Sequence, residues 1–325
     1  MTTLVTGVAG FIGFHVARKL LERGDTVVGI DNLNPYYDVS LKEDRLAQLT
    51  GQAGFSFHKC DFSNLEATRE ALDGHEIRRA VHLGAQAGVR YSLEHPFVYV
   101  ESNLTGHMVL LELARHTPDF EHLVYASSSS VYGGNTRLPF SESDRVDNPV
   151  SLYAATKKAD ELMSQSYSHL YRIPQTGLRF FTVYGPWGRP DMAMWIFTRA
   201  IIEGKPIRVF NHGDMRRDFT YIDDIVAGII ASLDNPPADD GEAPPHRVFN
   251  IGNHRSEQLM DMIAAIEKAL GMKAEKIMEP MQPGDVKDTY ADITAIQETL
   301  GFQPSTPIAV GVPRFVDWYR DYHDI

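Results

Sequence analysis

The sequence predicts an α/β protein built on a doubly wound parallel sheet, with a smaller C-terminal lobe. Three observations support this fold class. A short apolar run at residues 4–6 leads directly into glycines at three-residue spacing, which is typical of a buried parallel strand and a tight turn. The next stretch has helical periodicity, with Val16, Leu20 and Leu21 on one face. Further short apolar segments recur as far as residue 252, so strands continue to alternate with helical stretches.

The turn after the first strand carries three glycines, Gly7, Gly10 and Gly13. Glycine at these positions lets the chain turn tightly, brings backbone N–H groups against a pyrophosphate, and packs the next helix closely on the strand. A second strand, Thr26 to Ile30, ends at Asp31, whose carboxylate is placed to accept both hydroxyls of an adenosine ribose and to repel a 2′-phosphate. A glycine triplet alone is consistent with an ordinary turn. Strand, glycines, helix and acid together predict a Rossmann-type domain that binds NAD in preference to NADP.

Composition limits the class of protein. The chain has 325 residues, of which 43% are hydrophobic, enough to bury a sizeable core in two lobes. A formal net charge of −12 argues against nucleic acid or an anionic membrane surface as a partner. Cys60 is the only cysteine, which excludes disulfides within the chain and is compatible with the cytosol. No apolar run approaches the ~18 residues of a membrane span, and the first strand begins too close to Met1 for a signal peptide. We expect a soluble, cytoplasmic protein.

The ends of the second and third strands are expected to surround the adenosine of the cofactor. Asn32 and Asn34 follow the second strand and are placed beside the adenine ribose. The third strand, Phe55 to Cys60, ends at Asp61 and Phe62, which are placed to cap the adenine from the other side. For Phe62, a simple strand-end turn is an equally good interpretation.

The fourth strand, Ala80 to Leu83, is followed by small residues as far as Ala87, which would let the backbone approach a cofactor. His82 is expected to be a core histidine, because no second metal-binding residue stands at a useful spacing, and no metal site is predicted. A helix from Asn103 to Arg115 and a fifth strand from Leu123 to Ala126 follow.

The fifth strand leads into four serines, Ser127 to Ser130, which alone would be a polar loop. They gain significance from Tyr153 and Lys157, whose i, i+4 spacing places both side chains on one face of a predicted helix. A free phenol has a pKa of about 10 and is a poor base at neutral pH, but the charges of a nearby lysine and of nicotinamide favour the phenolate. Tyr153 can then accept a proton from a substrate alcohol while its carbon passes hydride to NAD, and a serine, assigned to Ser128, orients that alcohol. The trio predicts alcohol oxidation of the short-chain dehydrogenase type.

The second half of the chain is expected to leave the sheet and to return to it. A loop rich in turn residues and aromatic groups, from Thr182 to Met192, carries Arg189. Arg216 and Arg217 precede a predicted helix, and either arginine is able to meet a phosphate or to form an ordinary surface ion pair. The remaining predicted elements are a strand at Ile173–Phe181, a helix from Ile222, a strand returning to the sheet at Arg247–Gly252, a helix at Ser256–Leu270, and a C-terminal helix whose aromatic residues pack.

With these motifs in place, the chain resembles an extended short-chain dehydrogenase that acts on nucleotide sugars, over essentially its whole length. Within that superfamily, the UDP-glucuronate 4-epimerases are resembled most closely by HLGAQAGVRYSLEHP, RFFTVYGPWGRPDMA, RRDFTYIDDI and PMQPGDVKDTYAD. Epimerases of this type oxidise C4 with tightly held NAD, let the 4-keto sugar swing about its diphosphate linkage, and return the hydride to the opposite face. The resemblance therefore implies interconversion of UDP-glucuronate and UDP-galacturonate.

The resemblance and the strand ends together give a set of expected cofactor contacts. The residues expected to bind NAD are Gly7, Gly10, Phe11, Ile12, Gly13, Asp31, Asn32, Asn34, Asp61, Phe62, Leu83, Ala85, Ala87, Asn103, Tyr153 and Lys157. Gly84 departs from the more usual alanine at this strand end, a change that is expected to be tolerated.

The same resemblance implies a set of substrate contacts. These are Arg90, Ser128, Ser129, Ser130, Thr182, Arg189, Arg217 and Asp285. Related 4,6-dehydratases carry Thr-Asp-Glu where residues 128–130 are serines, so the elimination acid is missing here, and related UDP-xylose synthases carry a glutamate at position 130. Thr182 replaces a sugar-binding asparagine of the UDP-galactose 4-epimerases, which favours a carboxylate as the C6 substituent. Arg217 matches an arginine that grips the diphosphate and Asp285 an acid near the uridine ribose, whereas Gln282 replaces a second arginine.

Two lobes and a homodimer are also implied. Met1 to about Phe181, with a returning segment at about 222–252, is expected to form the NAD-binding domain, and about 182–221 with 253–325 the nucleotide-sugar lobe. Helices carrying Asn103 and Tyr153 commonly pair two subunits in this family. The alternatives are a UDP-glucuronate decarboxylase that makes UDP-xylose, another UDP-sugar 4-epimerase and, in a different class, a non-catalytic NAD-binding regulatory protein. Intact Tyr153 and Lys157 argue against the last of these.

Overall fold

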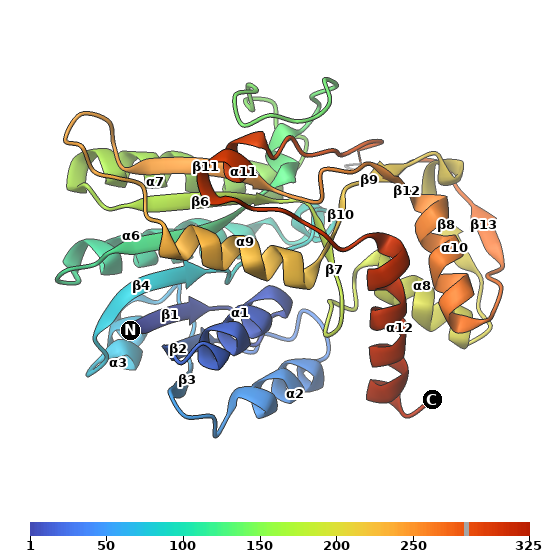
Figure 1. Ribbon diagram of the computed structural model, residues 1–325, viewed down its shortest axis with the longest axis horizontal. Helices are drawn as coiled ribbons and strands as arrows, with labels where there is room; N and C mark the ends of the chain where they lie inside the picture. Colours follow the sequence, from blue (N-terminus) through green and yellow to red (C-terminus); the bar gives the residue numbers. More distant parts are fainter. Residues whose placement is uncertain (283–285) are drawn as a thin grey trace.

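The fold is organised around a seven-stranded sheet in which all neighbouring strands are parallel (Figure 1). The computed structural model describes residues 1–282 and 286–325. From one edge to the other, the strands are β11 (His246–Ile251), β6 (Gln175–Phe180), β5 (His122–Ser128), β4 (Ile77–His82), β1 (Thr2–Thr6), β2 (Thr26–Asp31) and β3 (Phe55–Lys59). The order reverses at β1, and such a switch point is where open α/β sheets bind their ligands. The predicted doubly wound Rossmann-type fold is confirmed.

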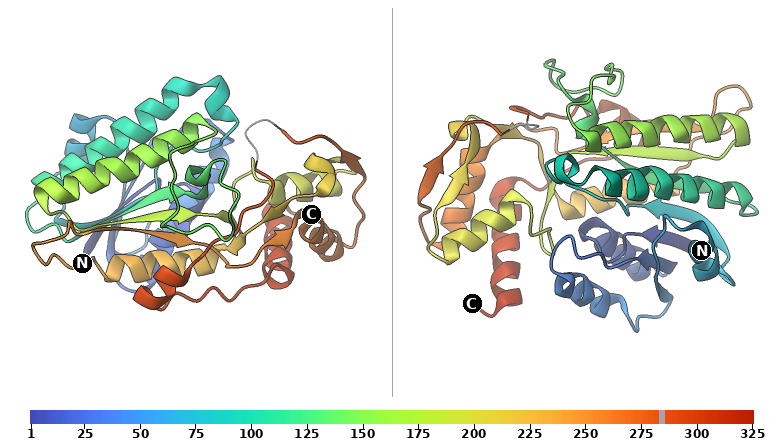
Figure 2. Two further views of the ribbon diagram at one scale, coloured as in Figure 1. Left: turned by 90° about the horizontal axis from the view of Figure 1, so that it is seen from above. Right: turned by 180° about the vertical axis from the view of Figure 1, so that it is seen from behind.

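Helices cover both faces of this sheet (Figure 2). One face carries α1 (Phe11–Glu22), α2 (Val39–Leu49) and α9 (Ile222–Asp234), and the other carries α3 (Leu65–Leu72), α6 (Gly106–His116) and α7 (Leu152–Tyr171). Neighbouring residues of a strand point to opposite faces, so Val5 of β1 joins the core beneath α1 whereas Leu4 joins the core beneath α6. The apolar run at the start of the sequence is therefore buried on both sides, as a central parallel strand requires.

Two predicted boundaries in this part of the chain are wrong. Two short helices, α4 (Tyr91–Glu94) and α5 (Pro96–Tyr99), lead into a π-helix, η1 (Val100–Thr105), which continues into α6. The helix expected from Asn103 thus begins earlier, with a wide turn that apolar periodicity does not mark. Strand β5 extends beyond Ala126, because Ser127 and Ser128 pair with β6, and a one-turn helix, η2 (Ser129–Tyr132), follows it.

The C-terminal lobe lies beside the carboxyl ends of the strands, on the right in Figure 1. It is entered through β7 (Thr182–Tyr184), which pairs with β10 (Phe219–Tyr221). The further elements of this lobe are α8 (Ala193–Ile202), β8 (Ile207–Val209), η3 (Phe210–Gly213), β9 (Arg216–Arg217), β12 (Glu257–Gln258), α10 (Leu259–Leu270), β13 (Lys276–Met278) and α12 (Ile308–His323). Helix α11 (Thr294–Leu300) instead packs on the sheet, against β11 and α9. The helix predicted from Ser256 begins at Leu259 instead, because the two preceding residues pair with β9 as β12.

Helix α12 packs through its aromatic residues. Phe315 and Tyr319 are buried, and the ring of Trp318 lies 5.2 Å from that of Trp187 and 5.4 Å from that of Trp195. These aromatic side chains join the C-terminal helix to the loop before α8 and to α8 itself. Within residues 1–282 and 286–325, no helix combines the length and the apolar character needed to cross a membrane.

Candidate active site

A cavity of about 980 Å³ lies at the carboxyl ends of the parallel strands, between the sheet and the C-terminal lobe. Its wall is formed by the turn after β1, the ends of β2, β4 and β5, the first turns of α7, and residues of the C-terminal lobe. Among these last are Ile207, Arg208, Phe210, Arg217 and Leu259. One continuous cavity therefore brings the glycine turn and the Tyr153 helix together with the segment expected to bind a sugar nucleotide.

The glycine turn has no space for side chains. A Cβ atom on Gly13 would lie 2.1 Å from the carbonyl oxygen of Gly7, and one on Gly7, at a φ of +68°, would lie 2.8 Å from Cα of Gly84. The turn closes through a hydrogen bond from Gly10 N to Gly7 O (2.9 Å), and α1 begins at the next residue. The first turn of α1 thus presents unpaired backbone N–H groups to the cavity, as a pyrophosphate requires. The residues of this turn fit a dinucleotide.

Asp31 is held at the tip of β2 by backbone donors. Its carboxylate accepts hydrogen bonds from Leu33 N (2.8 Å) and Ala9 N (3.2 Å), so its direction is fixed before any ribose arrives. Burial raises the pKa of Asp31, against the lowering effect of the Lys42 charge and of these N–H groups. Lys42 also lines the cavity and donates to the backbone oxygen of Asn34 (2.8 Å).

Asp61 and Asn103 were expected to contact the cofactor, and neither is among the described residues that line the cavity. Asp61 accepts a hydrogen bond from Asn32 Nδ2 (3.0 Å), and it is Asn32 that lines the cavity. Asn103 is buried, accepts from Gln86 N (2.8 Å) and donates to Thr156 Oγ1 (3.1 Å). Because it ties the loop after β4 to α7, Asn103 positions that loop and does not itself contact the cavity.

The other predicted cofactor residues do line the cavity. These are Gly7, Gly10, Phe11, Ile12, Gly13, Asn34, Phe62, Leu83, Ala85 and Ala87. The ring of Phe62 is packed so closely against two glycines that a Cβ on Gly84 would lie 2.5 Å from it, and one on Gly106 would lie 2.3 Å from it. The glycine at position 84 therefore makes room for Phe62.

Tyr153 and Lys157 project from the first turns of α7 into the cavity. The helix is capped by Ser151, whose hydroxyl accepts from Ala154 N (3.1 Å). The ammonium of Lys157 is almost fully buried and donates to Ala126 O (2.9 Å) and to Asp160 Oδ2 (3.0 Å). Burial raises the pKa of Asp160 to about 6, against the lowering effect of Lys157. Asp160 was not predicted from the sequence, although a carboxylate three residues after a lysine on a helix indicates such a pair.

The four serines have different surroundings. Ser127 donates to Glu161 Oε1 (2.7 Å), and Glu161 is paired with the equally buried Arg179. Ser128 donates to Ser130 Oγ and accepts from Ser130 N, both at 3.1 Å, so these two hydroxyls form one unit. All four serines line the cavity, and Ser127 in addition holds the strand end through its bond to Glu161.

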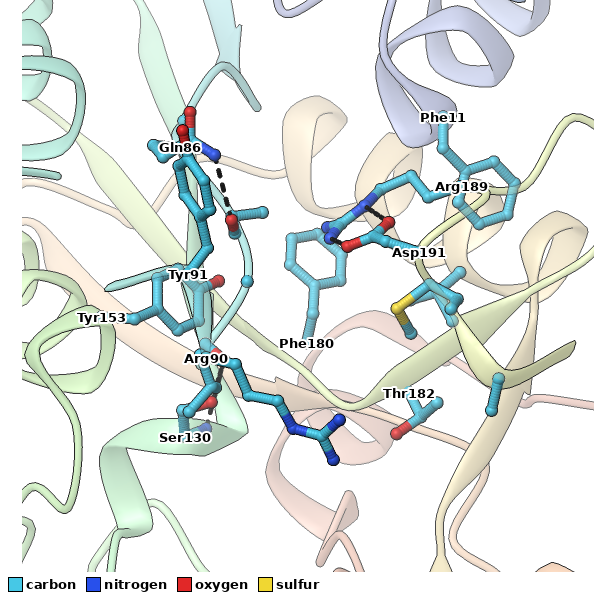
Figure 3. Close-up of a pocket in the computed structure, with 18 of the residues that line it drawn as sticks. Phe11, Gln86, Arg90, Tyr91, Ser130, Tyr153, Phe180, Thr182, Arg189 and Asp191 are labelled. Carbon is cyan, nitrogen blue, oxygen red and sulfur yellow. Dashed lines mark hydrogen bonds and ion pairs between the residues drawn. The ribbon is translucent and has the colours of Figure 1, made fainter. Parts of the chain in front are cut away.

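The predicted substrate residues approach the cavity from several elements (Figure 3). The guanidinium of Arg90 extends toward Thr182, whereas Arg189 lies near Phe11 and is paired with Asp191. The loop was expected to present Arg189 as its charge, but Asp191 offsets that charge through Nε to Oδ1 (3.0 Å) and a second contact from Nη2. Asp191 also accepts from the Tyr36 hydroxyl (3.0 Å).

Near the diphosphate end of the predicted site, Arg217 lines the cavity and donates through Nη1 to the backbone oxygens of Arg216 and Lys287, both at 2.8 Å. These two bonds fix the orientation of the Arg217 guanidinium. Asp285 lies outside the described residues. Within the described part of the chain, no group of three His, Cys, Asp or Glu side chains is arranged to hold a metal ion.

Comparison with known proteins identifies what this geometry is similar to. Residues 3–252 match the family model described as the NAD dependent epimerase/dehydratase family. The chain is 50% identical to protein CapI of Staphylococcus aureus, over 99% of each chain, and 47% identical to UDP-glucuronate 4-epimerase 4 of Arabidopsis thaliana, over 99% of this chain and 76% of the plant protein. Among solved structures, the UDP-glucuronic acid 4-epimerase of Bacillus cereus in complex with UDP-glucuronic acid and NAD superposes with a TM-score of 0.90, at 34% identity, over 99% of this chain and 100% of that one.

Proposed function

The chain belongs to the NAD-dependent epimerase/dehydratase family, and from that premise we propose that it interconverts UDP-glucuronate and UDP-galacturonate by epimerisation at C4. Its cofactor is NAD, and its class is isomerase. The observation that carries the proposal is that one cavity joins the glycine turn, Tyr153 and Lys157 to a wall of hydroxyls at residues 128–130, where related dehydratases have acids.

In the proposed reaction at C4, the residues of α7 and the serines after β5 have different roles. When bound, NAD supplies an acceptor for the C4 hydride and a donor that returns it. Tyr153 accepts the proton of the C4 hydroxyl and later gives it back, and Lys157 lies one helical turn further on the same face of α7. The paired hydroxyls of Ser128 and Ser130 orient the alcohol. No net proton or hydride is lost, so one cofactor serves many turnovers.

The C6 carboxylate sets an additional requirement. Oxidation at C4 of a glucuronate gives a β-keto acid, which loses carbon dioxide when its C5–C6 bond aligns with the carbonyl π-system. Fixed donors that hold the carboxylate away from this alignment slow that loss. We assign this task to Thr182, the serines of 128–130 and Arg189, and Arg90 is directed toward the same part of the cavity. Asp191 already pairs with Arg189 and offsets its charge. We therefore expect the hydroxyl groups of this wall to contribute more to binding of the C6 carboxylate than Arg189 does.

The deciding experiment is to mix the purified protein with UDP-glucuronate and to follow the sugar by NMR. We expect UDP-galacturonate with little pentose and with no added nicotinamide consumed. Release of carbon dioxide at a rate comparable to epimerisation would assign the protein as a UDP-xylose-forming decarboxylase instead. Turnover of UDP-glucose but not of UDP-glucuronate would indicate a neutral-sugar 4-epimerase, and no turnover of either would favour a regulatory protein.

Apolar side chains exposed on one group of helices support a proposal for the subunit arrangement. Leu93, Phe97 and Val100 of the α4–η1 segment are 56%, 83% and 43% exposed, and Leu162 of α7 is 60% exposed. Helix α7 contacts α4, α5 and η1, so these side chains belong to neighbouring elements, and exposed apolar surface of this kind favours association. We propose a homodimer through this surface, tested by sedimentation of the wild type and of Phe97→Asp, which we expect to be monomeric.

The proposal also covers the division of the chain into domains and its location in the cell. We propose that residues 1–181 with about 222–252 form the NAD-binding domain and that about 182–221 with 253–325 form the nucleotide-sugar lobe. The elements that line each side of the cavity support this division, whereas α11 of the second segment packs back against β11 and α9. A cytoplasmic location is supported by Cys60, a buried free thiol in a chain without other cysteines.

A further inference from the structure

Arg45 of α2 is a fully buried arginine whose donors all meet uncharged oxygen atoms. Its side chain has no exposed surface. It donates to Ala9 O (2.9 Å), to the hydroxyl of Tyr37 (2.8 Å), to Trp187 O (2.7 and 3.2 Å) and to Gly188 O (3.1 Å). Removing a charge from water is costly unless its hydrogen bonds are replaced. The cost of burying this charge therefore indicates that the protein needs the arrangement of backbone carbonyl groups that the Arg45 guanidinium holds together.

The acceptors of Arg45 belong to two separate walls of the cavity. Ala9 lies between Gly7 and Gly10 in the turn expected to hold the pyrophosphate. Trp187 and Gly188 immediately precede Arg189 in the loop between β7 and α8. The backbone of this loop is unusual, since Trp187 has a φ of +61°, a conformation that side chains rarely adopt. Two hydrogen bonds from Arg45 to the Trp187 carbonyl hold it there.

A second contact joins the same two walls. Tyr36, which precedes α2, donates to Asp191 Oδ2 (3.0 Å), and Asp191 pairs with Arg189. The segment from Tyr36 to Arg45 is thus bonded at both ends to the loop of residues 187–191. The dinucleotide turn and the predicted sugar loop are consequently held in one arrangement by side chains of α2 and the segment before it.

We propose that Arg45 is a positioning residue, which sets the loop of residues 185–192 against the dinucleotide turn and thereby aligns the sugar with the nicotinamide. The inference rests on the proposed epimerase function. Arg45 lies behind the wall and does not reach the reacting atoms. Its planar group spans several carbonyl oxygens at once, and a lysine ammonium has neither this reach nor this number of donors. A displacement of about 1 Å between reacting groups lowers a rate by on the order of a hundredfold.

The test compares Arg45→Lys with Arg79→Lys. Arg79 is also buried and paired, to Asp234 at 3.1 Å, but it lies in β4 away from the cavity, so its variant reports the cost of removing a buried guanidinium elsewhere. We expect Arg45→Lys to lower kcat by about tenfold to a hundredfold and to raise the fraction of released 4-keto or pentose product. For Arg79→Lys, we expect kcat and the product ratio to stay within about twofold of wild type. A change of this size is much smaller than the loss of rate that misaligned reacting groups cause.

The product ratio separates positioning from stability. A lower melting temperature of Arg45→Lys with unchanged kcat and unchanged product ratio would overturn the proposal. If Arg45→Lys does not fold, Tyr36→Phe removes the second contact without a change in charge, and it should raise the same by-products. An unchanged product ratio in Tyr36→Phe would then overturn the proposal.

The wild-type enzyme is assayed first. A wild-type protein that does not convert UDP-glucuronate overturns the proposed function but not the role of Arg45, which is then measured from cofactor exchange. At least tenfold faster release of bound NAD from Arg45→Lys than from Arg79→Lys would support a role of Arg45 in holding the dinucleotide turn against the loop of residues 185–192. Equal release rates would refute it.

Discussion

Replacement of Glu161 by glutamine tests how the strand end beneath the serines is held. The Glu161 carboxylate accepts from Arg179 at 2.8 and 2.9 Å, from Lys158 at 3.1 Å and from the Ser127 hydroxyl at 2.7 Å, and both Glu161 and Arg179 are 3% exposed. In the variant, one carboxylate oxygen becomes an amide NH₂ group that faces N–H donors, and Arg179 loses its counter-charge.

The expected loss of stability is large. Breaking a buried ion pair at one partner costs about 3–5 kcal/mol, because a charge is left without compensation. Glutamine keeps one acceptor oxygen, so we expect Glu161→Gln to lower the free energy of unfolding at pH 7 by about 3 kcal/mol. Urea unfolding of wild type and variant, at equal NAD concentration because bound cofactor stabilises the folded state, measures this difference. A loss below about 1 kcal/mol would refute the reasoning, since that is the value of an exposed pair.

The pH dependence gives an independent check. Burial acts to raise the pKa of Glu161, but the hydrogen bonds and charge of Arg179 hold it below the ordinary value of 4.5. Because the folded pKa is depressed, the stabilisation is fully present above pH 4.5 and is lost as pH falls through the folded pKa. The difference between wild type and Glu161→Gln should therefore shrink below pH 4.5. A difference that stays constant with pH would mean that the pKa of Glu161 is the same in the folded and unfolded states.

A matched double variant separates charge from packing. Replacing Glu161 by leucine and Arg179 by methionine together removes both buried charges and leaves only the partly exposed Lys158 without its partner, so we expect it to be less destabilising than Glu161→Gln alone. Should the double variant lose at least as much stability as the single one, side-chain volume rather than charge would be the cause.

The remaining predictions concern the reaction. Tyr153→Phe should bind NAD and UDP-glucuronate nearly as the wild type does and turn over several orders of magnitude more slowly, as steady-state kinetics would show; more than about a tenth of the wild-type rate would exclude Tyr153 as the base. NAD should purify with the protein and should not be replaced by NADP, because the Asp31 carboxylate, held by two backbone N–H groups at the end of β2, is expected to repel a 2′-phosphate; stoichiometric release of NADH during turnover would contradict an epimerase cycle. Thr182→Ala and Arg189→Ala should each raise the pentose or 4-keto-pentose fraction measured by NMR, and an unchanged fraction in both would remove these residues from carboxylate binding.

The sequence alone determined the fold class of this protein, and it predicted the residues to which we assign the chemistry. Both depend on local patterns of fixed spacing. The glycines of residues 7–13 have to follow a strand and precede a helix, and Tyr153 and Lys157 share a face because four residues make about one helical turn. Asp31 was identified for the same reason, because the end of a strand is visible in the run of apolar residues before it.

Only the tertiary structure decided which residues touch the cavity and which hold its walls. Asn103 belongs to the second group, because its partners lie on a loop and a helix at other points of the chain. The pairing of Arg189 with Asp191 shows that charge in a sequence does not reveal how far it is already compensated. Arg45 and Trp187 stand 142 positions apart, and their hydrogen bond exists only because the fold brings α2 against the loop that follows β7. Contacts of this kind leave no periodicity in the sequence, since their geometry is set by how the two lobes pack and not by the spacing of neighbouring residues.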